Sequence, residues 1–309
     1  MRLTYLLTAM MLLVAGCTEY ESIEDFPIAE PALVANSLFQ ADSAITVYVS
    51  RSLSILDNAE IKPITDATVV IYKDGLAVDT IRESNESQAY VSAIFPESGH
   101  RYSVRVFRSG YDTVTSTSES LPAVLSVGKI TAVPVDSTIT ELWYQDNVHD
   151  DSAFTYYSMD VALTINDPVN EHNIYSVMVL KEDSSIFSSD LRYQTSSVYF
   201  TSNDMSLLDN ADLENSGSYR TVAYFDDRNF DGKQYQFKFR IEDNEWTTFA
   251  AKYRVLVRSL TETSYKYFRS LNSNYNETSP FDEPARVYTN IHNGFGIFAG
   301  YERKSYRIR

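Results

Sequence analysis

Apolar and polar side chains alternate along several short segments of this chain, and this alternation restricts it to a mainly β fold. In residues 235–241, Tyr-Gln-Phe-Lys-Phe-Arg-Ile, the aromatic and aliphatic side chains would face one way and Gln, Lys and Arg the other. Residues 159–165 alternate as well, and residues 67–72 are rich in β-branched side chains. Because successive side chains of a strand point to opposite faces, each segment predicts a half-buried strand.

The same signals recur at the spacing of a β-sandwich, with turn residues between them. Strands are expected at residues 45–50, 67–72, 76–81, 89–94, 102–107, 113–117, 159–165, 174–180, 219–225, 235–241 and 253–259. Lys73-Asp74-Gly75 is a hairpin turn signal. We therefore predict an all-β (mainly β) protein, with an N-terminal Ig-like or transthyretin-like β-sandwich at residues 31–122 followed by a larger β-rich domain at residues 123–309.

One segment of the second domain departs from the β pattern. A short helix is expected near residues 264–272, because four residues recur there at helical spacing: Ser264, Tyr267, Phe268 and Leu271. Thr261 or Thr263 could cap its start, since a threonine hydroxyl can accept a hydrogen bond from a free backbone N–H of the first turn. Residues 202–218 are polar and predict a long loop or a short helix.

The chain contains a single cysteine, Cys17, so no intrachain disulfide can form. Residues 1–16 have an arginine near the start, a short apolar run and small residues before the cysteine, which are the parts of a secretory signal. The run is shorter than the roughly 20 residues that span a bilayer. Leu-Val-Ala-Gly-Cys at residues 13–17 resembles the bacterial lipobox, which predicts lipid attachment at Cys17. The alternatives are a cleaved signal with an unrelated cysteine, or a buried start of the fold.

Residues 17–30 are expected to be an acidic tether. Residues 18–25 contain four acids and no base, a pattern typical of a solvated segment. The segment also resembles the acidic signal that sends many Bacteroidetes lipoproteins to the outer face of the outer membrane. This resemblance favours the cell surface, and a periplasm-facing anchor is the alternative.

The charge balance argues against a nucleic-acid partner. The chain has 26 Lys and Arg against 42 Asp and Glu, a formal net charge of −16. Binding to phosphates requires clustered basic residues, and the only dense positive run is at residues 302–309.

Two groups of motifs resemble an uncharacterised (domain-of-unknown-function) lipoprotein family of Bacteroidetes, often encoded beside TonB-dependent outer-membrane receptors. The N-terminal half resembles carboxypeptidase-regulatory-like and transthyretin-like modules through Cys17, Glu30-Pro31, residues 63–69 and Gly110-Tyr111. The C-terminal half contributes residues 267–271, 281–284 and 290–300. The resemblance implies an outer-membrane location and a receptor as a partner. We expect an accessory or ligand-capture subunit, or alternatively a structural or adhesive surface lipoprotein.

Residues 227–232, Asp-Arg-Asn-Phe-Asp-Gly, match the first half of an EF-hand calcium loop. Asp227, Asn229 and Asp231 would supply the ligands, yet Lys238 stands where a bidentate Glu is required. The favoured interpretation is a turn between the strands at 219–225 and 235–241, in which Asp231-Gly232 adopts positive φ.

Aromatic residues provide the remaining candidates for a binding site. Trp143, Tyr144 and Trp246 could stack on a ligand, although core packing is favoured for most of the aromatic residues. The chain contains neither G-x-S-x-G nor H-E-x-x-H, and an acylated Cys17 offers no free thiol. We therefore expect no catalytic residues and no cofactor.

Overall fold

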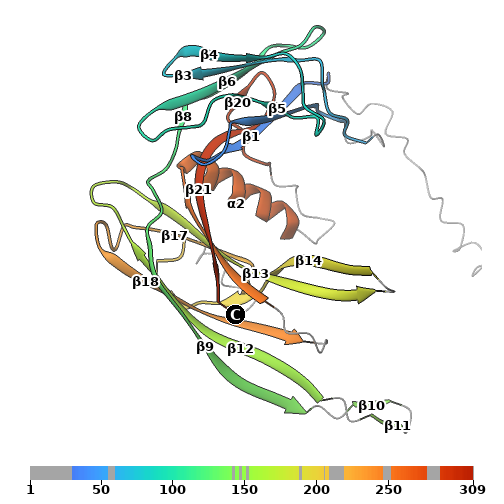
Figure 1. Ribbon diagram of the computed structural model, residues 1–309, viewed down its shortest axis with the longest axis vertical. Coiled ribbons are helices and arrows are strands. Elements are labelled where there is room, and N and C mark those ends of the chain that lie inside the picture. The colour runs from blue at the N-terminus through green and yellow to red at the C-terminus, as the bar shows by residue number, and fades with distance from the viewer. Residues whose placement is uncertain are drawn as a thin grey trace, which may run out of the picture.

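A computed structural model describes residues 30–54, 60–140, 143–145, 148–150, 153–187, 190–204, 206–208, 219–245, 252–276 and 286–308. In these described residues the protein is mainly β, with 55% strand and a single short helix, which confirms the predicted fold class. Two β-sandwiches lie at opposite ends of the molecule, and the helix lies between them (Figure 1).

The upper sandwich in Figure 1 packs two sheets around one apolar core. One sheet has the order β20-β7-β6-β3-β4, with β8 also on β6, and the other has the order β21-β1-β2-β5. Its strands, other than the long β21, are β1 (Leu33–Phe39), β2 (Thr46–Arg51), β3 (Thr68–Lys73), β4 (Leu76–Ile81), β5 (Tyr90–Val91), β6 (Arg101–Phe107), β7 (Val114–Ser116), β8 (Glu119–Ser120) and β20 (Ile291–His292).

Two local predictions for this sandwich have different outcomes. The hairpin turn is confirmed, because Asp74 and Gly75 between β3 and β4 both have positive φ, at 51° and 81°. The strand expected at 89–94 is reduced to the two residues of β5. Beyond β5, the Asp79 carboxylate accepts hydrogen bonds from Ser92 Oγ at 2.7 Å and from the Ala93 N–H at 2.9 Å. These bonds tie the following residues to β4, while the Ser92 N–H and the Ile94 carbonyl still bond the backbone of Ile45, directly before β2.

The lower sandwich packs a second pair of sheets around another core. One sheet has the order β16-β15-β18-β12-β9, and the other is formed by β14-β13-β19-β21 with β17 also on β13. Its strands, again without β21, are β9 (Val127–Thr140), β12 (Ala153–Asn166), β13 (Ile174–Phe187), β14 (Asp190–Val198), β15 (Phe200–Thr201), β16 (Tyr219–Arg220), β17 (Val222–Asp226), β18 (Gln234–Glu245) and β19 (Lys252–Leu260). β10 (Trp143–Gln145) and β11 (Val148–Asp150) form a separate hairpin.

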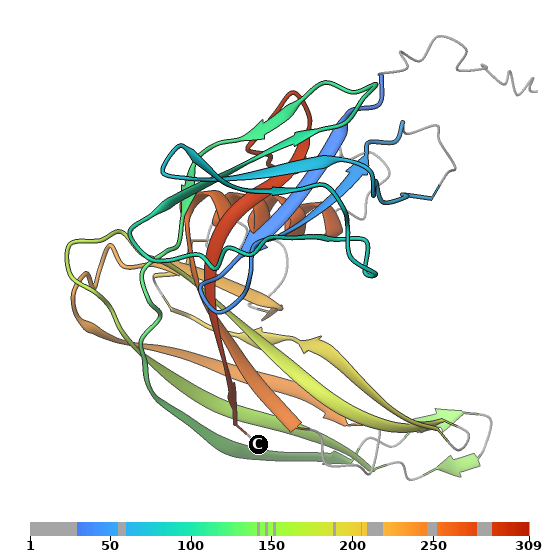
Figure 2. The same cartoon turned by 45° about the horizontal axis from the view of Figure 1, so that its top comes forward.

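Strand β21 (Phe295–Arg307) belongs to both sandwiches. Residues 295–300 pair in parallel with β1, whereas residues 301–307 pair antiparallel with β19. Figure 2 shows this strand running from the upper sandwich into the lower one. Phe298 and Ile291 lie in the upper core, although the boundary expected at residue 122 assigns them to the C-terminal segment. Residues 298–300 lie in the first half of β21.

Helix α2 (Glu262–Asn276) is longer than predicted and begins at the expected cap. Thr261 Oγ1 accepts a hydrogen bond from the Ser264 N–H at 3.2 Å, so Thr261 is the cap and Thr263 is not. The helix packs through Tyr265, which meets Tyr224 edge-on at 5.5 Å between ring centroids. Tyr265 is not one of the four residues predicted at helical spacing. Its contact with Tyr224 depends on where the helix lies on the sheet, which helical spacing alone does not specify.

Candidate functional site

Several predicted site residues fall where the structure gives no side-chain placement. Cys17 and Trp246 lie outside the described residues. Trp143 and Tyr144 lie in strand β10, and only their backbone is described. Lipid attachment at Cys17 and ligand stacking on the three aromatic residues therefore remain predictions.

Residues 227–233 form a turn between β17 and β18, as predicted. The Phe230 N–H donates to the Asp227 carbonyl at 2.8 Å, and the Lys233 N–H donates to the Phe230 carbonyl at 2.8 Å. Gly232 has a φ of +68°, the positive value expected there. Its α-carbon lies close to Val169, so the turn is packed against the loop that joins β12 to β13.

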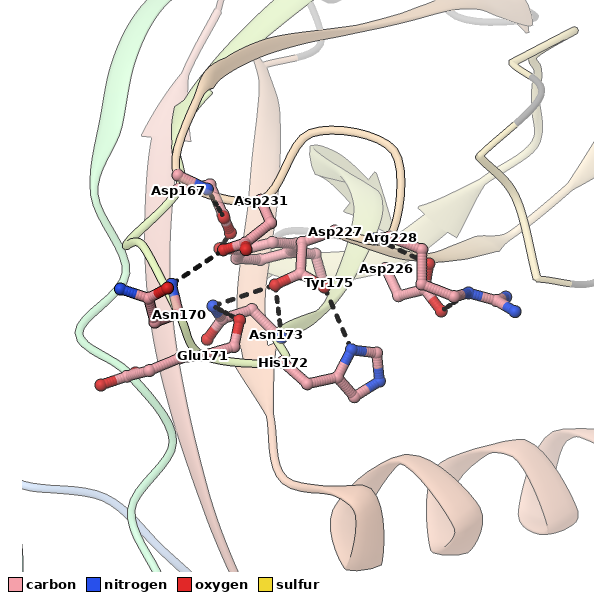
Figure 3. Close-up of polar contacts among 11 residues, drawn as sticks. Asp167, Asn170, Glu171, His172, Asn173, Tyr175, Asp226, Asp227, Arg228 and Asp231 are labelled. Carbon is pink, nitrogen blue, oxygen red and sulfur yellow. Dashed lines mark hydrogen bonds and ion pairs between the residues drawn. The ribbon is translucent and has the colours of Figure 1, made fainter.

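This packing brings together three carboxyl groups from two turns (Figure 3). One oxygen each from Asp167, Asp227 and Asp231 lies within 4.8 Å of the other two. Asn229, the third residue of the predicted calcium ligands, is exposed. Asp167 could not be found from sequence spacing, because it lies 60 positions before Asp227. We call these three residues the aspartate cluster.

Hydrogen bonds from the protein itself occupy the aspartate cluster. Asp227 accepts from the Asn173 N–H at 2.8 Å and contacts His172 Nδ1 at 3.0 Å. The other two carboxyl groups have partners as well: Asp167 accepts from the Tyr175 hydroxyl at 2.5 Å and from the Gly232 N–H at 2.9 Å, and Asp231 accepts from the Asn170 N–H at 3.0 Å. These bonds fasten the 227–233 turn to the loop that follows β12.

The aspartate cluster concentrates negative charge in a poorly solvated place. Burial raises the pKa of Asp167, and the charges of Asp227 and Asp231 raise it further, against the hydrogen bonds from Tyr175 and Gly232. Burial and the bond to Asp167 also raise the pKa of Tyr175, so that its hydroxyl stays a donor. A proton on Asp167 or a hard cation such as Ca²⁺ could each relieve the repulsion, since both compensate carboxylate charge.

Asp167→Asn is expected to flatten the dependence of stability on pH. Because the pKa of Asp167 is raised on folding, its contribution is complete at low pH and is lost as the pH rises through the folded value. The variant cannot titrate there, so its melting temperature should increase relative to that of the wild type as the pH rises above about 4, the ordinary pKa of an aspartate. Parallel melting curves would contradict this expectation. A melting temperature that rises with added calcium in the wild type, but not in Asp167→Asn, would show that a cation compensates the carboxylate charge.

A second feature lies on the outer face of the sheet that contains β9, β12, β18 and β15. A groove of about 870 Å³ opens there, and most of its lining residues are polar or charged. The lining residues are Thr131, Val133, Asp160, Val161, Ala162, Thr201, Ser202, Asn203, Asp204, Gln236, Lys238, Phe239, Arg240 and Glu242. We call this the polar groove. Its floor includes the Gln, Lys and Arg side chains that the alternation in residues 235–241 places on one face.

The polar groove has an ordered floor. Arg240 donates to both oxygens of Asp160 across β18 and β12, from Nε at 2.7 Å and from an Nη at 3.0 Å. This bidentate pair lowers the pKa of Asp160. Ala162 lies beside it and pairs with Lys238 on the neighbouring strand, so its small side chain leaves space above the sheet.

One wall of the polar groove is formed by the chain that follows β15. Ser202 Oγ donates to the Lys238 carbonyl at 2.7 Å. Asp204 accepts from the Tyr235 hydroxyl, and burial together with this carboxylate raises the pKa of Tyr235 to about 12. These bonds hold the wall in place without a ligand, which reduces the ordering cost of binding.

A family model described as a domain of unknown function (DUF4249) matches residues 18–307. The chain belongs to this family. No curated protein and no solved structure matches it. The DUF4249 match includes both sandwiches, the aspartate cluster and the polar groove. In the described part of this DUF4249 chain, no helix has the length and apolar character to cross a membrane.

Proposed function

We propose that this protein is a lipid-anchored outer-membrane lipoprotein that captures a ligand for a TonB-dependent uptake system and catalyses no reaction. The polar groove is the observation that carries the capture role. It is preformed, it opens on the outer face of a sheet, and it presents donors and acceptors of both charge signs. Such a surface suits recognition of a polar ligand, since few placed polar groups fix a ligand's orientation.

The lipid anchor is supported by the sequence at Cys17. Two or three acyl chains on this residue would hold the protein stably at a membrane, whereas a single chain binds only marginally. Glu30 follows Cys17 by 13 positions, so an extended tether would reach at most about 45 Å. The two sandwiches would therefore stay near the membrane surface, close to an integral receptor.

Cys17→Ser is expected to release the protein from the membrane. The serine hydroxyl cannot form the thioether that acylation requires, so the variant should appear in the soluble fraction of native cells, whereas the wild type sediments with outer membranes. Proteolysis of intact cells would then distinguish the cell surface from the periplasmic face. A variant that still sediments with the membrane would remove the lipid anchor from the proposal.

Purification of the tagged wild type from solubilised native membranes tests the partner. We expect an outer-membrane receptor to copurify, and the Lys238→Glu/Arg240→Glu variant to retain the receptor but lose the captured ligand. The charge-matched control is Arg82→Glu/Lys129→Glu, which changes exposed residues outside the polar groove. A membrane-bound protein that copurifies with no receptor would favour the structural or adhesive alternative.

A further inference from the structure

A second cavity, in the upper sandwich, is lined by three cations in a strongly acidic chain. It has a volume of about 430 Å³ and lies between the end of β2, residues 62–66 and the turn after β6. Arg51, Lys62 and Arg108 supply its positive charge, and Asp66 is the one acid among its lining residues. We call it the basic pocket. Its local charge of +2 is opposite in sign to the net charge of −16.

One cation of the basic pocket is held in place by its neighbours. The Arg108 Nε lies 2.7 Å from Asp66 Oδ1, and an Nη donates to Oδ2 at 3.1 Å. The guanidinium also lies over the ring of Tyr111, at 5.3 Å from the ring centroid. These contacts fix its direction while leaving its remaining N–H groups for a ligand.

The other two cations have no such partners. Within the part of the chain that the structure describes, no carboxylate forms an ion pair with Arg51 or Lys62. Arg51 is opposite Leu33 at the end of β2, and Ser50 forms a bridge with Pro63, which brings Lys62 close to it. Three cations in one pocket repel one another, and among the described residues only Arg108 has a counter-charge.

Hydrogen bonds from the buried Tyr90 hold the wall of the basic pocket in place. This tyrosine is fully buried, and its hydroxyl donates to the Ile64 carbonyl at 2.9 Å and accepts from the Ala67 N–H at 2.8 Å. The segment that carries Asp66 is therefore anchored to the core. A ligand would enter a site whose shape is already set, without an ordering cost for this segment.

We propose that the basic pocket binds a phosphate monoester. A monoester carries a charge of about −1.5 to −2 at neutral pH, which balances the local charge of +2 in the pocket. A carboxylate or a phosphodiester carries only one negative charge. Its three terminal oxygens can accept from cations that approach from different directions. The cavity is larger than a phosphate group, so it leaves space for the alcohol to which the phosphate is esterified.

Two kinds of ligand carry a phosphate monoester: a membrane lipid with a monoester headgroup, or a soluble phosphate monoester. The lipid source rests on the proposed anchor, since Arg51 is opposite Leu33, only three positions after Glu30. The pocket would then lie within tether reach of the membrane. Binding of the soluble monoester requires no anchor, so its outcome is independent of the proposed function.

Calorimetric titration of the full chain carrying Cys17→Ser, which cannot be acylated, tests the pocket with glycerol 3-phosphate at constant ionic strength. We expect saturable binding that Arg51→Ala/Lys62→Ala weakens at least about tenfold, since each charge-assisted contact is worth that order. Arg82→Ala/Lys129→Ala removes the same charge at exposed positions outside the pocket and should change the affinity less than about twofold. Melting curves establish that each variant is folded.

Cosedimentation of the same proteins with vesicles identifies the source. A lipid headgroup is supported if the protein binds vesicles of phosphatidylcholine with phosphatidic acid but not vesicles of phosphatidylcholine alone. Arg51→Ala/Lys62→Ala must also abolish this vesicle binding. Binding of glycerol 3-phosphate without vesicle binding supports a soluble monoester. The proposal is overturned if glycerol 3-phosphate does not bind, if sulfate binds equally well, or if the two double variants lose affinity equally.

Discussion

Gly296→Ala is expected to lower the free energy of unfolding by about 4 kcal/mol, one of the largest effects of any single substitution in this protein. Gly296 has a φ of +114°, which L side chains rarely adopt. It also pairs with Ala35 in the parallel ladder between β21 and β1. An added Cβ would lie 2.7 Å from the Ala35 carbonyl carbon and closer still to its oxygen. The methyl group therefore forces β1 and β21 apart.

Urea denaturation followed by circular dichroism measures this loss, and Gly75→Ala is the matched control. Gly75 also has a positive φ, at +81°, but no atom lies within 4 Å of an added Cβ. The control isolates the conformational cost, which is about 1–2 kcal/mol for an L residue at positive φ. Equal losses in the two variants would show that the close approach of β1 to β21 contributes nothing.

Asn290→Ala is expected to lower the free energy of unfolding by about 3 kcal/mol, because it removes the side-chain hydrogen bonds to the buried N–H and carbonyl of Phe298. The Asn290 side chain is 5% exposed. Its Oδ1 accepts from the Phe298 N–H at 2.9 Å, and its Nδ2 donates to the Phe298 carbonyl at 2.9 Å. The same Nδ2 donates to Thr117 Oγ1 at 2.8 Å and to a carboxylate oxygen of Glu119 at 3.3 Å.

Asn290→Asp provides a more specific test of the same hydrogen bonds. At neutral pH the new carboxylate would be buried beside Glu119 and the Phe298 carbonyl, so we expect a larger loss than with alanine. Protonation restores a donor, so acidification should recover part of the loss in Asn290→Asp and none in Asn290→Ala. Asn229→Ala, at an exposed asparagine of the 227–233 turn, should stay within about 0.5 kcal/mol of the wild type. A comparable loss there would mean that burial of Asn290 is not the cause.

Both substitutions act on residues 290–300, the C-terminal segment that packs in the upper sandwich before β21 continues into the lower one. Asn290 closes a loop back onto Phe298 in β21, and Gly296 permits β21 to lie against β1. Glu119 and Thr263 extend the same network to helix α2 through a hydrogen bond of 3.1 Å. Structural demands of this kind account for the residue types in this segment without assigning it a ligand.

Sequence reasoning succeeded where the determining contacts are local. Alternation in residues 235–241 identified both the strand and the face that forms the floor of the polar groove. Turn chemistry identified the hairpin at Asp74-Gly75 and the positive φ of Gly232. Position before the helical repeat reduced the candidates for the cap to Thr261 and Thr263, of which the structure shows Thr261. Each of these features depends on side chains within a few positions of one another.

The sequence by itself determined the fold class, the faces of most strands and the expected anchor at Cys17. Only the tertiary structure decided which distant segments are neighbours: β21 beside β1, Asp167 beside the 227–233 turn, and Arg108 beside Arg51 and Lys62. The physical reason is that periodicity specifies which face of a strand is buried, whereas the partner across the sheet depends on the path of the whole chain. The aspartate cluster and the basic pocket both depend on such long-range neighbours: the motif at residues 227–232 supplied Asp227 and Asp231 but not Asp167, and the basic pocket has no sequence motif.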